Sequence, residues 1–218
     1  MRGARLILLR QRPPAHKGGL IMPYNNGQQS PNMPPQGEKP GKGFYELLDC
    51  ISTDLFIGAA WHLRAANQLR KMGLRGFARL HEYGSCHDHK KRLCLEKLVC
   101  DRLHYAPKID VSDAEHVTSF VLSDPGKLKP HLEMWRDNER EFAKYLAEAV
   151  KLAAGEDMCV YNELVCILDG VQDEVFRIET LLKRLELGGW SGHDLATISR
   201  QLHIHFEHHP EKGLDIDV

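Results

Sequence analysis

Four long stretches of helical periodicity constrain this chain more than any other feature. They run over residues 44–71, 74–103, 130–154 and 157–187, and in each the apolar residues recur at spacings of three and four. None of them shows the strict alternation of a β-strand. Helices of this length are roughly 40 Å long at 1.5 Å per residue. The sequence therefore predicts an all-α fold built from four long helices.

The connections between these stretches predict how the helices are arranged. Gly73 separates the first stretch from the second, and Gly155 separates the third from the fourth, so each pair is joined by a tight turn. Residues 106–129 are long enough to travel the length of a bundle, and a short final helix is expected over 193–203. This order is that of a four-helix bundle with one long crossover and a short fifth helix.

Both ends of the chain are predicted to lie outside the bundle, which covers residues 44–203. Residues 13–43 are rich in Pro, Gly, Asn and Gln and carry almost no apolar side chains. Such a stretch cannot bury enough surface to offset its ordering entropy, so we expect a disordered tail over residues 1–43. Residues 204–218 are expected to form a histidine-rich C-terminal tail. A transit peptide and a translation start at Met22 both remain open for the first residues.

Charge and hydropathy exclude two classes of partner. Lys+Arg is 29 against Asp+Glu 30, a formal net charge of −1, which gives no electrostatic footprint for nucleic acid or an anionic membrane. No apolar run approaches the roughly 18 residues that span a bilayer. The absence of a CxxC pair indicates reduced thiols, most of them predicted to be small core residues of a cytoplasmic protein: Cys50, Cys86, Cys94, Cys100, Cys159 and Cys166.

One acidic residue interrupts the apolar stripe of each long helix near its middle, and these are Asp54, Asp88, Glu139 and Glu174. In a bundle the four would lie at one level. Burying isolated carboxylates costs several kcal/mol each unless they are paired or bound to metal. Two interpretations stay open: divalent metals such as iron or manganese, which suit hard oxygen ligands, or a buried Lys91 as an internal counter-charge.

In helix order, helix lengths and the long crossover, residues 44–206 resemble the ferritin superfamily, and bacterioferritin most closely. Short local likenesses accompany this order: Gly73-Leu74-Arg75 at the start of the second helix, Leu146-Ala147-Glu148-Ala149 in the third, and Ile178-Glu179-Thr180 in the fourth. The resemblance implies an iron-storage or iron-detoxification protein. It also implies self-association into a hollow shell, or co-assembly with another ferritin.

The family's two-iron centre takes a Glu from each of the first and third helices and a Glu-x-x-His from each of the other two. In this chain those positions fall on Asp54, Glu139, Asp88 with Lys91, and Val171 with Glu174. Lys91 places a cation where a ligand is expected, and Val171 removes a carboxylate. The resemblance therefore implies a degenerate centre with at most weak ferroxidase activity. Its metal residues would be Asp54, Asp88, Glu139 and Glu174, holding one or two irons per chain.

Several histidines complete the candidate residues. Bacterioferritins hold haem between two subunits through a Met of the second helix, and that position falls on His89, so haem is a second implied cofactor. His81 and His87 are candidate replacement ligands for a metal. Near the C-terminus, His203, His205, His208 and His209 suggest weak binding of transition metals.

Two other interpretations stay open besides the storage protein. One is a catalytically inactive structural or interaction subunit of a ferritin-like shell. The other is a helical bundle that binds haem or another metal through histidine and cysteine. A resemblance at the level of the fold does not choose among the three.

Overall fold

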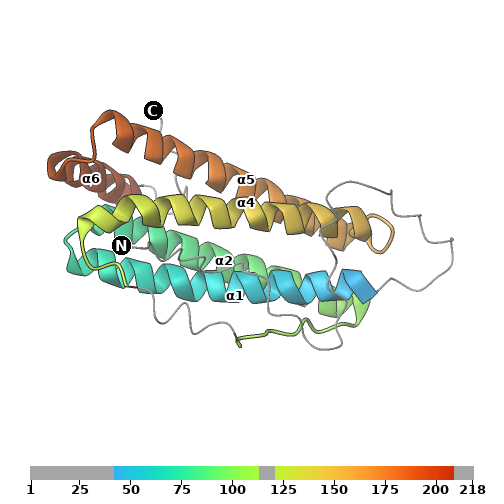
Figure 1. The fold of residues 1–218 in the computed structure, drawn as a ribbon. Helices are drawn as coiled ribbons and strands as arrows, with labels where there is room; N and C mark the ends of the chain where they lie inside the picture. The colour runs from blue at the N-terminus through green and yellow to red at the C-terminus, as the bar shows by residue number, and fades with distance from the viewer. Residues whose placement is uncertain (1–41, 113–120, 209–218) are drawn as a thin grey trace.

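The computed structural model describes residues 42–112 and 121–208. Within them the chain is helical, as Figure 1 shows, with the elements α1 (Lys42–Lys71), α2 (Arg75–Leu103), the 3-10 turn η1 (Pro125–Lys127), α4 (Leu128–Ala153), α5 (Met158–Leu187) and α6 (Gly192–His208). The prediction of an all-α bundle with a long crossover and a short last helix is confirmed. The predicted N-terminal tail lies outside the described residues, except that α1 begins at Lys42.

The four long helices form two hairpins that lie side by side (Figure 1). The turn between α1 and α2 uses Gly73 at a φ of +77°, a left-handed conformation that favours glycine. The turn between α4 and α5 ends at Asp157, whose Oδ1 accepts hydrogen bonds from the backbone N–H groups of Cys159 and Val160 at 2.9 and 3.0 Å. This is the N-cap arrangement that starts a helix.

The long crossover is held against α1 at both of its ends. The Tyr105 hydroxyl and the Lys108 backbone N–H each donate to Asp49 Oδ1 at 2.7 Å. Further along, the Leu122 backbone N–H donates to Gln68 Oε1. From Asp49 to Gln68 the helix rises roughly 28 Å, so the crossover travels most of the length of the bundle, as predicted.

The apolar core is divided into two halves. The α6 half lies between the α1–α2 turn and α6, and includes Trp61, Phe77, Leu132, Ile178 and Leu202. The distal half lies at the other end and includes Phe44, Ile51, Leu95, Phe142 and Leu164. Between them, described residues 81–94, 136–141 and 172–177 contribute no buried apolar side chain to either half. We call this level the polar middle.

The last helix is longer than the sequence analysis expected. It ends at His208 rather than near His203, because Leu202 and Phe206 continue its buried stripe. At its centre α6 touches α2: a Cβ on Gly76 would lie 1.8 Å from the Ser199 carbonyl oxygen. The Gly76 N–H also donates to Ser199 Oγ at 3.0 Å. Residues 204–208 therefore belong to the bundle and not to a tail.

The prediction that the cysteines are core residues is wrong. All six are free and exposed, because they fall on the solvent side of their helices. On α2, for example, Leu95 and Val99 are buried while Cys94 and Cys100 are exposed. At Cys50, partial desolvation and the negative charge of Asp54 raise the pKa of the thiol to about 11. The thiol of Cys50 is therefore protonated at neutral pH.

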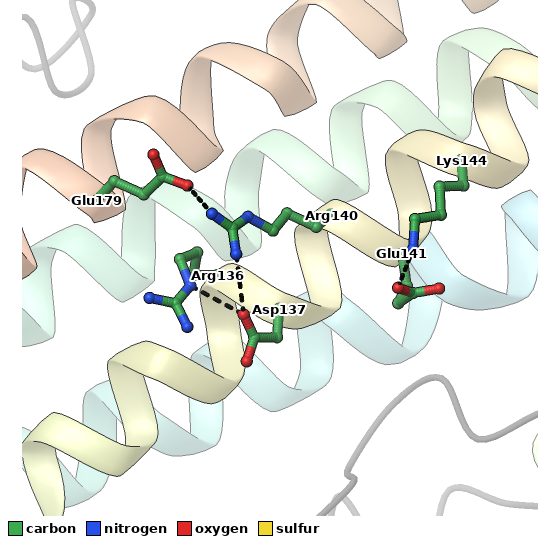
Figure 2. A network of polar contacts seen from close by, with 6 residues as sticks. All are labelled: Arg136, Asp137, Arg140, Glu141, Lys144 and Glu179. Atoms are coloured by element: carbon green, nitrogen blue, oxygen red, sulfur yellow. Dashed lines mark hydrogen bonds and ion pairs between the residues drawn. The ribbon is translucent and has the colours of Figure 1, made fainter.

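The outer face of the α4–α5 hairpin carries a network of ion pairs, shown in Figure 2. Arg140 contacts both Asp137 of its own helix and Glu179 of α5, and Arg136 Nε donates to Asp137 Oδ1 at 2.9 Å. These side chains are largely solvated, so each pair contributes at most about 1 kcal/mol.

No helix among the described residues is long and apolar enough to cross a membrane.

Candidate functional site

The four predicted metal residues all lie in or beside the polar middle, one on each long helix. Glu139 is buried at 8% exposure, as its apolar stripe predicts, and the other three are half-buried. Among residues 42–112 and 121–208, however, no three histidine, cysteine or carboxylate side chains converge as a metal-ligand set. The assignment of Asp54, Asp88, Glu139 and Glu174 as metal residues therefore stays a prediction.

Two glycines make room for a polar pair between α1 and α2. A Cβ on Gly58 would lie 2.7 Å from Asp88 Oδ2, so the carboxylate of α2 rests on the backbone of α1. Reciprocally, a Cβ on Gly84 would lie 3.0 Å from the His62 ring. Asp88 Oδ2 and His62 Nε2 are 3.9 Å apart. Larger residues at Gly58 or Gly84 would push this pair out of place.

Three buried histidines continue inward from Asp88. His62 Nδ1 lies 2.8 Å from His81 Nδ1, and His81 Nε2 lies 3.1 Å from His131 Nε2. All three side chains are at most 3% exposed. We call this arrangement the histidine chain. Because His81 uses its two nitrogens on opposite sides of the ring, the three imidazoles do not point at one common centre.

The charge of Asp88 fixes the direction of these hydrogen bonds. At 3.9 Å the carboxylate is too far for a hydrogen bond, but its negative charge favours a proton on the facing Nε2 of His62, so His62 Nδ1 accepts from the Nδ1–H of His81. His81 Nε2 then accepts from the Nε2–H of His131. One proton on each ring satisfies both ring-to-ring hydrogen bonds of the histidine chain, and the tautomers are assigned from these contacts.

Burial keeps His81 and His131 neutral. It lowers the pKa of His131 to about 3. Burial, followed by the neighbouring His131 and His62, holds the pKa of His81 well below its ordinary value. His87, on the same helix, has its pKa lowered to about 4 by burial and by the nearby charge of Lys91. A neutral imidazole costs far less to bury than a charged one.

Two tryptophans enclose the histidine chain on the side of the α6 half. Trp61 stacks on His131 with ring centroids 4.8 Å apart and an interplanar angle of 23°. Trp135 lies 4.6 Å from His81, and the two indoles meet edge to face at 6.3 Å. Five aromatic rings therefore form one packed cluster, with the half-buried Asp88 at its polar end.

Lys91 and Val171 decide whether the family's two-iron centre fits. Lys91 is 8% exposed, and its Nζ has no hydrogen-bond partner among the described residues. A Cβ on Gly170 of α5 would lie 3.7 Å from that Nζ. Val171 packs in the distal half of the core. A buried lysine and an aliphatic side chain offer no carboxylate or imidazole to a metal, and the degenerate two-iron centre stays a prediction.

The remaining candidate histidines are placed separately. His89 is exposed on α2, and haem binding there stays a prediction. His203 Nε2 lies 3.1 Å from Glu207 Oε1 within α6. His205 and His208 lie in the same helix and not on an extended end, while His209 lies outside the described residues.

Sequence reasoning missed two members of the histidine chain. His131 lies three residues after Leu128 and four before Trp135, which is the spacing of the buried face of α4, so its burial was visible in the periodicity. His62 follows the buried Trp61 and lies four residues after Gly58, a weaker signal. Their contact with His81 depends on three helices and has no local signal.

Comparison with known proteins supports the fold only. No family model and no curated protein matches the chain. An open-pore ferritin from the hyperthermophilic archaeon Archaeoglobus fulgidus is similar in structure, with a TM-score of 0.65 and 17% identity over 77% of this chain and 99% of that one. An engineered closed form of that ferritin gives a TM-score of 0.63 with 18% identity, covering 75% of this chain and 96% of that one. A humanized archaeal ferritin gives 0.56 with 20% identity, covering 75% and 97%. The described helices therefore form a ferritin-like bundle.

Proposed function

We propose that the protein is an iron-storage or iron-detoxification subunit of the ferritin type with a degenerate oxidation centre. The observation that carries this proposal is a ferritin-like bundle with an acidic residue on each long helix, including the buried Glu139. Iron is the cargo in this proposal. We place weak binding of Fe(II) at Asp54, Asp88, Glu139 and Glu174.

Two side chains make the proposed centre degenerate. Two irons that share carboxylates need negative ligands, and the ammonium of Lys91 repels a nearby cation. Val171 supplies no ligand atom at all. Any oxidation of Fe(II) is therefore expected to be slow, and retained iron would depend on carboxylates elsewhere on the subunit.

Self-association, a cytoplasmic location and the bacterioferritin branch belong to the same proposal. The branch predicts haem on His89 between two copies. Addition of haem to the purified protein tests this point. A haem absorbance band that disappears in His89→Ala supports it, and an equal band in both proteins contradicts it.

A second candidate function is a catalytically inactive structural subunit of a shell. The specific observation in its favour is the histidine chain, whose two ring-to-ring hydrogen bonds already use both nitrogens of His81. Under this alternative the polar middle stabilises the bundle, and iron binds no better than to any acidic surface.

The deciding experiment measures size and iron retention on one purified sample. Fe(II) is added in air, unbound iron is removed, and iron per chain is determined beside the mass from light scattering. The storage proposal expects a large assembly that retains iron in proportion to the amount added. An assembly that retains none supports the structural subunit, and a monomer without iron contradicts both.

A designed variant tests the position of the centre. Lys91→His with Val171→Glu restores two ligand side chains, so we expect Fe(II) oxidation at least about tenfold faster than in the unmodified protein, as for a catalytic group regained. Lys90→His, an exposed neighbour on the same helix, is the matched control. Equal rates in all three proteins would show that the family's centre does not lie at this level.

A further inference from the structure

A pocket unrelated to the polar middle lies between the α1–α2 turn, Pro125 and α6. Its volume is about 430 Å³, within the range of about 300–1,000 Å³ typical of small-molecule sites. Apolar side chains form much of its lining, and they are Met72, Leu74, Pro125, Leu195 and Ala196. We call it the α6 pocket.

The polar part of the α6 pocket is basic. Arg75 from the start of α2 and Arg200 and His203 from α6 line it, and no acidic residue is among the described residues of its lining. A ligand in this pocket would meet two guanidinium groups and one imidazole. Guanidinium groups bind carboxylates and phosphates through parallel hydrogen bonds.

The two arginines are distinguished by having no partner of their own. Neither Arg75 nor Arg200 makes a hydrogen bond or ion pair with any described residue. Every other arginine in the described ranges makes a hydrogen bond, an ion pair or another interaction within the protein. The arginines left available are therefore the two that line one pocket.

His203 adds a second, independent observation. Its Nε2 is paired with Glu207 at 3.1 Å, but its Nδ1 is buried and has no hydrogen-bond partner among the described residues. A buried polar atom without a partner is costly, and here it belongs to a residue that lines the α6 pocket.

The walls of the α6 pocket are held in place before any ligand arrives. Gly76 brings α2 into backbone contact with α6 at Ser199, which itself lines the pocket, and the Gly76 N–H is bonded to the Ser199 hydroxyl. The turn residue Gly73 fixes the opposite wall in its left-handed conformation. A preformed pocket loses little entropy on binding.

We propose that the α6 pocket binds a small organic anion with a carboxylate or phosphate head and a short apolar body. Arg75 and Arg200 hold the head group, and the side chains of Met72, Leu195 and Ala196 contact the body. This site is independent of iron, so its success or failure leaves the proposed storage function untouched.

The test uses hexanoate and hexyl phosphate as probes, titrated into the full chain by calorimetry. Saturable binding of one probe or both is expected, and the tighter one identifies the head group. The double variant Arg75→Gln with Arg200→Gln should lose at least about tenfold in affinity, a loss of about 1.4 kcal/mol. The matched control, Arg79→Gln with Arg184→Gln, removes two charges from partnered arginines and should change affinity less than about twofold.

Further variants and probes separate the two parts of the pocket. Ala196→Trp should abolish binding of both probes by filling the apolar part, while circular dichroism reports whether each variant is folded. Inorganic phosphate that binds as tightly as hexyl phosphate would overturn the role of the apolar wall. Wild-type protein that binds neither probe at millimolar concentration would overturn the site itself. If light scattering shows that the double variant loses only self-association, the arginines contact a second copy, and the proposal is wrong.

Discussion

The two apolar halves of the bundle and the polar middle between them are stabilised in different ways. In each half, aliphatic and aromatic side chains are removed from water, and their contribution follows the buried area with little dependence on direction. In the polar middle, His62, His81 and Asp88 each need a particular partner atom. The apolar halves can therefore tolerate substitutions between apolar residues of similar volume. The polar middle cannot, because each polar side chain there needs its particular partner atom.

The same contrast appears in how the helices approach each other. In the polar middle, Gly58 and Gly84 accept the side chains of Asp88 and His62 from the facing helix. In the distal half, by contrast, side chains such as Ile51 and Phe142 fill the space. The polar side chains are therefore accommodated because glycines on the facing helix leave room for them, and not because the core is loosely packed.

The largest expected effect is in an apolar half. Phe142→Ala removes a side chain that is 1% exposed in the distal half, and should lower the free energy of unfolding by about 3–5 kcal/mol. Phe176→Ala is the matched control, because Phe176 is 69% exposed on α5 and should change stability by less than about 0.5 kcal/mol. Urea unfolding followed by circular dichroism measures both. Equal losses would mean that the distal half is not a packed core.

Acid should destabilise the histidine chain. Burial lowers the pKa of His81 and His131 in the folded protein, whereas in the unfolded chain both titrate near 6.5. The unfolded state therefore binds more protons below pH 6.5. The contribution of the buried neutral rings to the free energy of unfolding is present in full above that pH and is lost as the pH falls toward about 3. For each buried ring the loss reaches about 1.4 kcal/mol per pH unit.

Urea midpoints at pH 8, 6, 5 and 4 measure this dependence. His131→Gln should flatten the profile, because it removes one of the two fully buried rings. His89→Gln removes an exposed histidine of α2 and serves as the control. A profile for His131→Gln as steep as that of the unmodified protein would contradict the neutral histidine chain.

A smaller effect should follow from filling the space under Asp88. Gly58→Ala places a Cβ 2.7 Å from Asp88 Oδ2, and the required shift should cost about 1–3 kcal/mol. Adding Asp88→Ala should remove most of that cost, which a double-mutant cycle measures as a coupling energy. Gly43→Ala has nothing within 4 Å of the new Cβ and should be neutral or stabilising. Additive losses at Gly58 and Asp88 would contradict their contact.

The smallest effect belongs to the ion-pair network of Figure 2. Arg140→Gln removes the contacts to Asp137 and Glu179, both on a solvated face. Its cost should be below about 1 kcal/mol and should shrink further in 0.5 M salt, because salt screens exposed charges. If the free energy of unfolding fell by much more than this, or if the loss did not change with salt, these side chains would have to be buried like those of the polar middle.

The sequence analysis predicted the helices well for a physical reason. Each long helix carries an apolar stripe toward both of its ends, and turn glycines such as Gly73 separate the helices, so periodicity and turn chemistry agree. The same stripes predicted that Glu139 is buried. The end of α6 was placed too early, because the histidines around Phe206 obscured its continuing apolar stripe.

The polar middle could be predicted only in part. The stripe of α2 included His81 and Asp88, but their partner His62 is 19 residues away and His131 is 50 residues away from His81. The rotation of one helix against another decides such contacts, and no local pattern encodes it. The cysteines were misjudged for the opposite reason: a general burial tendency was applied to positions such as Cys94 that local periodicity places in solvent.

The indole rings beside the histidine chain give the protein a built-in optical reporter. A protonated imidazole accepts an electron from an excited indole and quenches its fluorescence, whereas a neutral imidazole does so weakly. Trp61 and Trp135 touch the histidine chain. The ring centroid of Trp190 instead lies 5.5 Å from Lys129 Nζ. With Trp190 replaced by phenylalanine, the emission intensity of this protein would read out the charge of its own buried histidines.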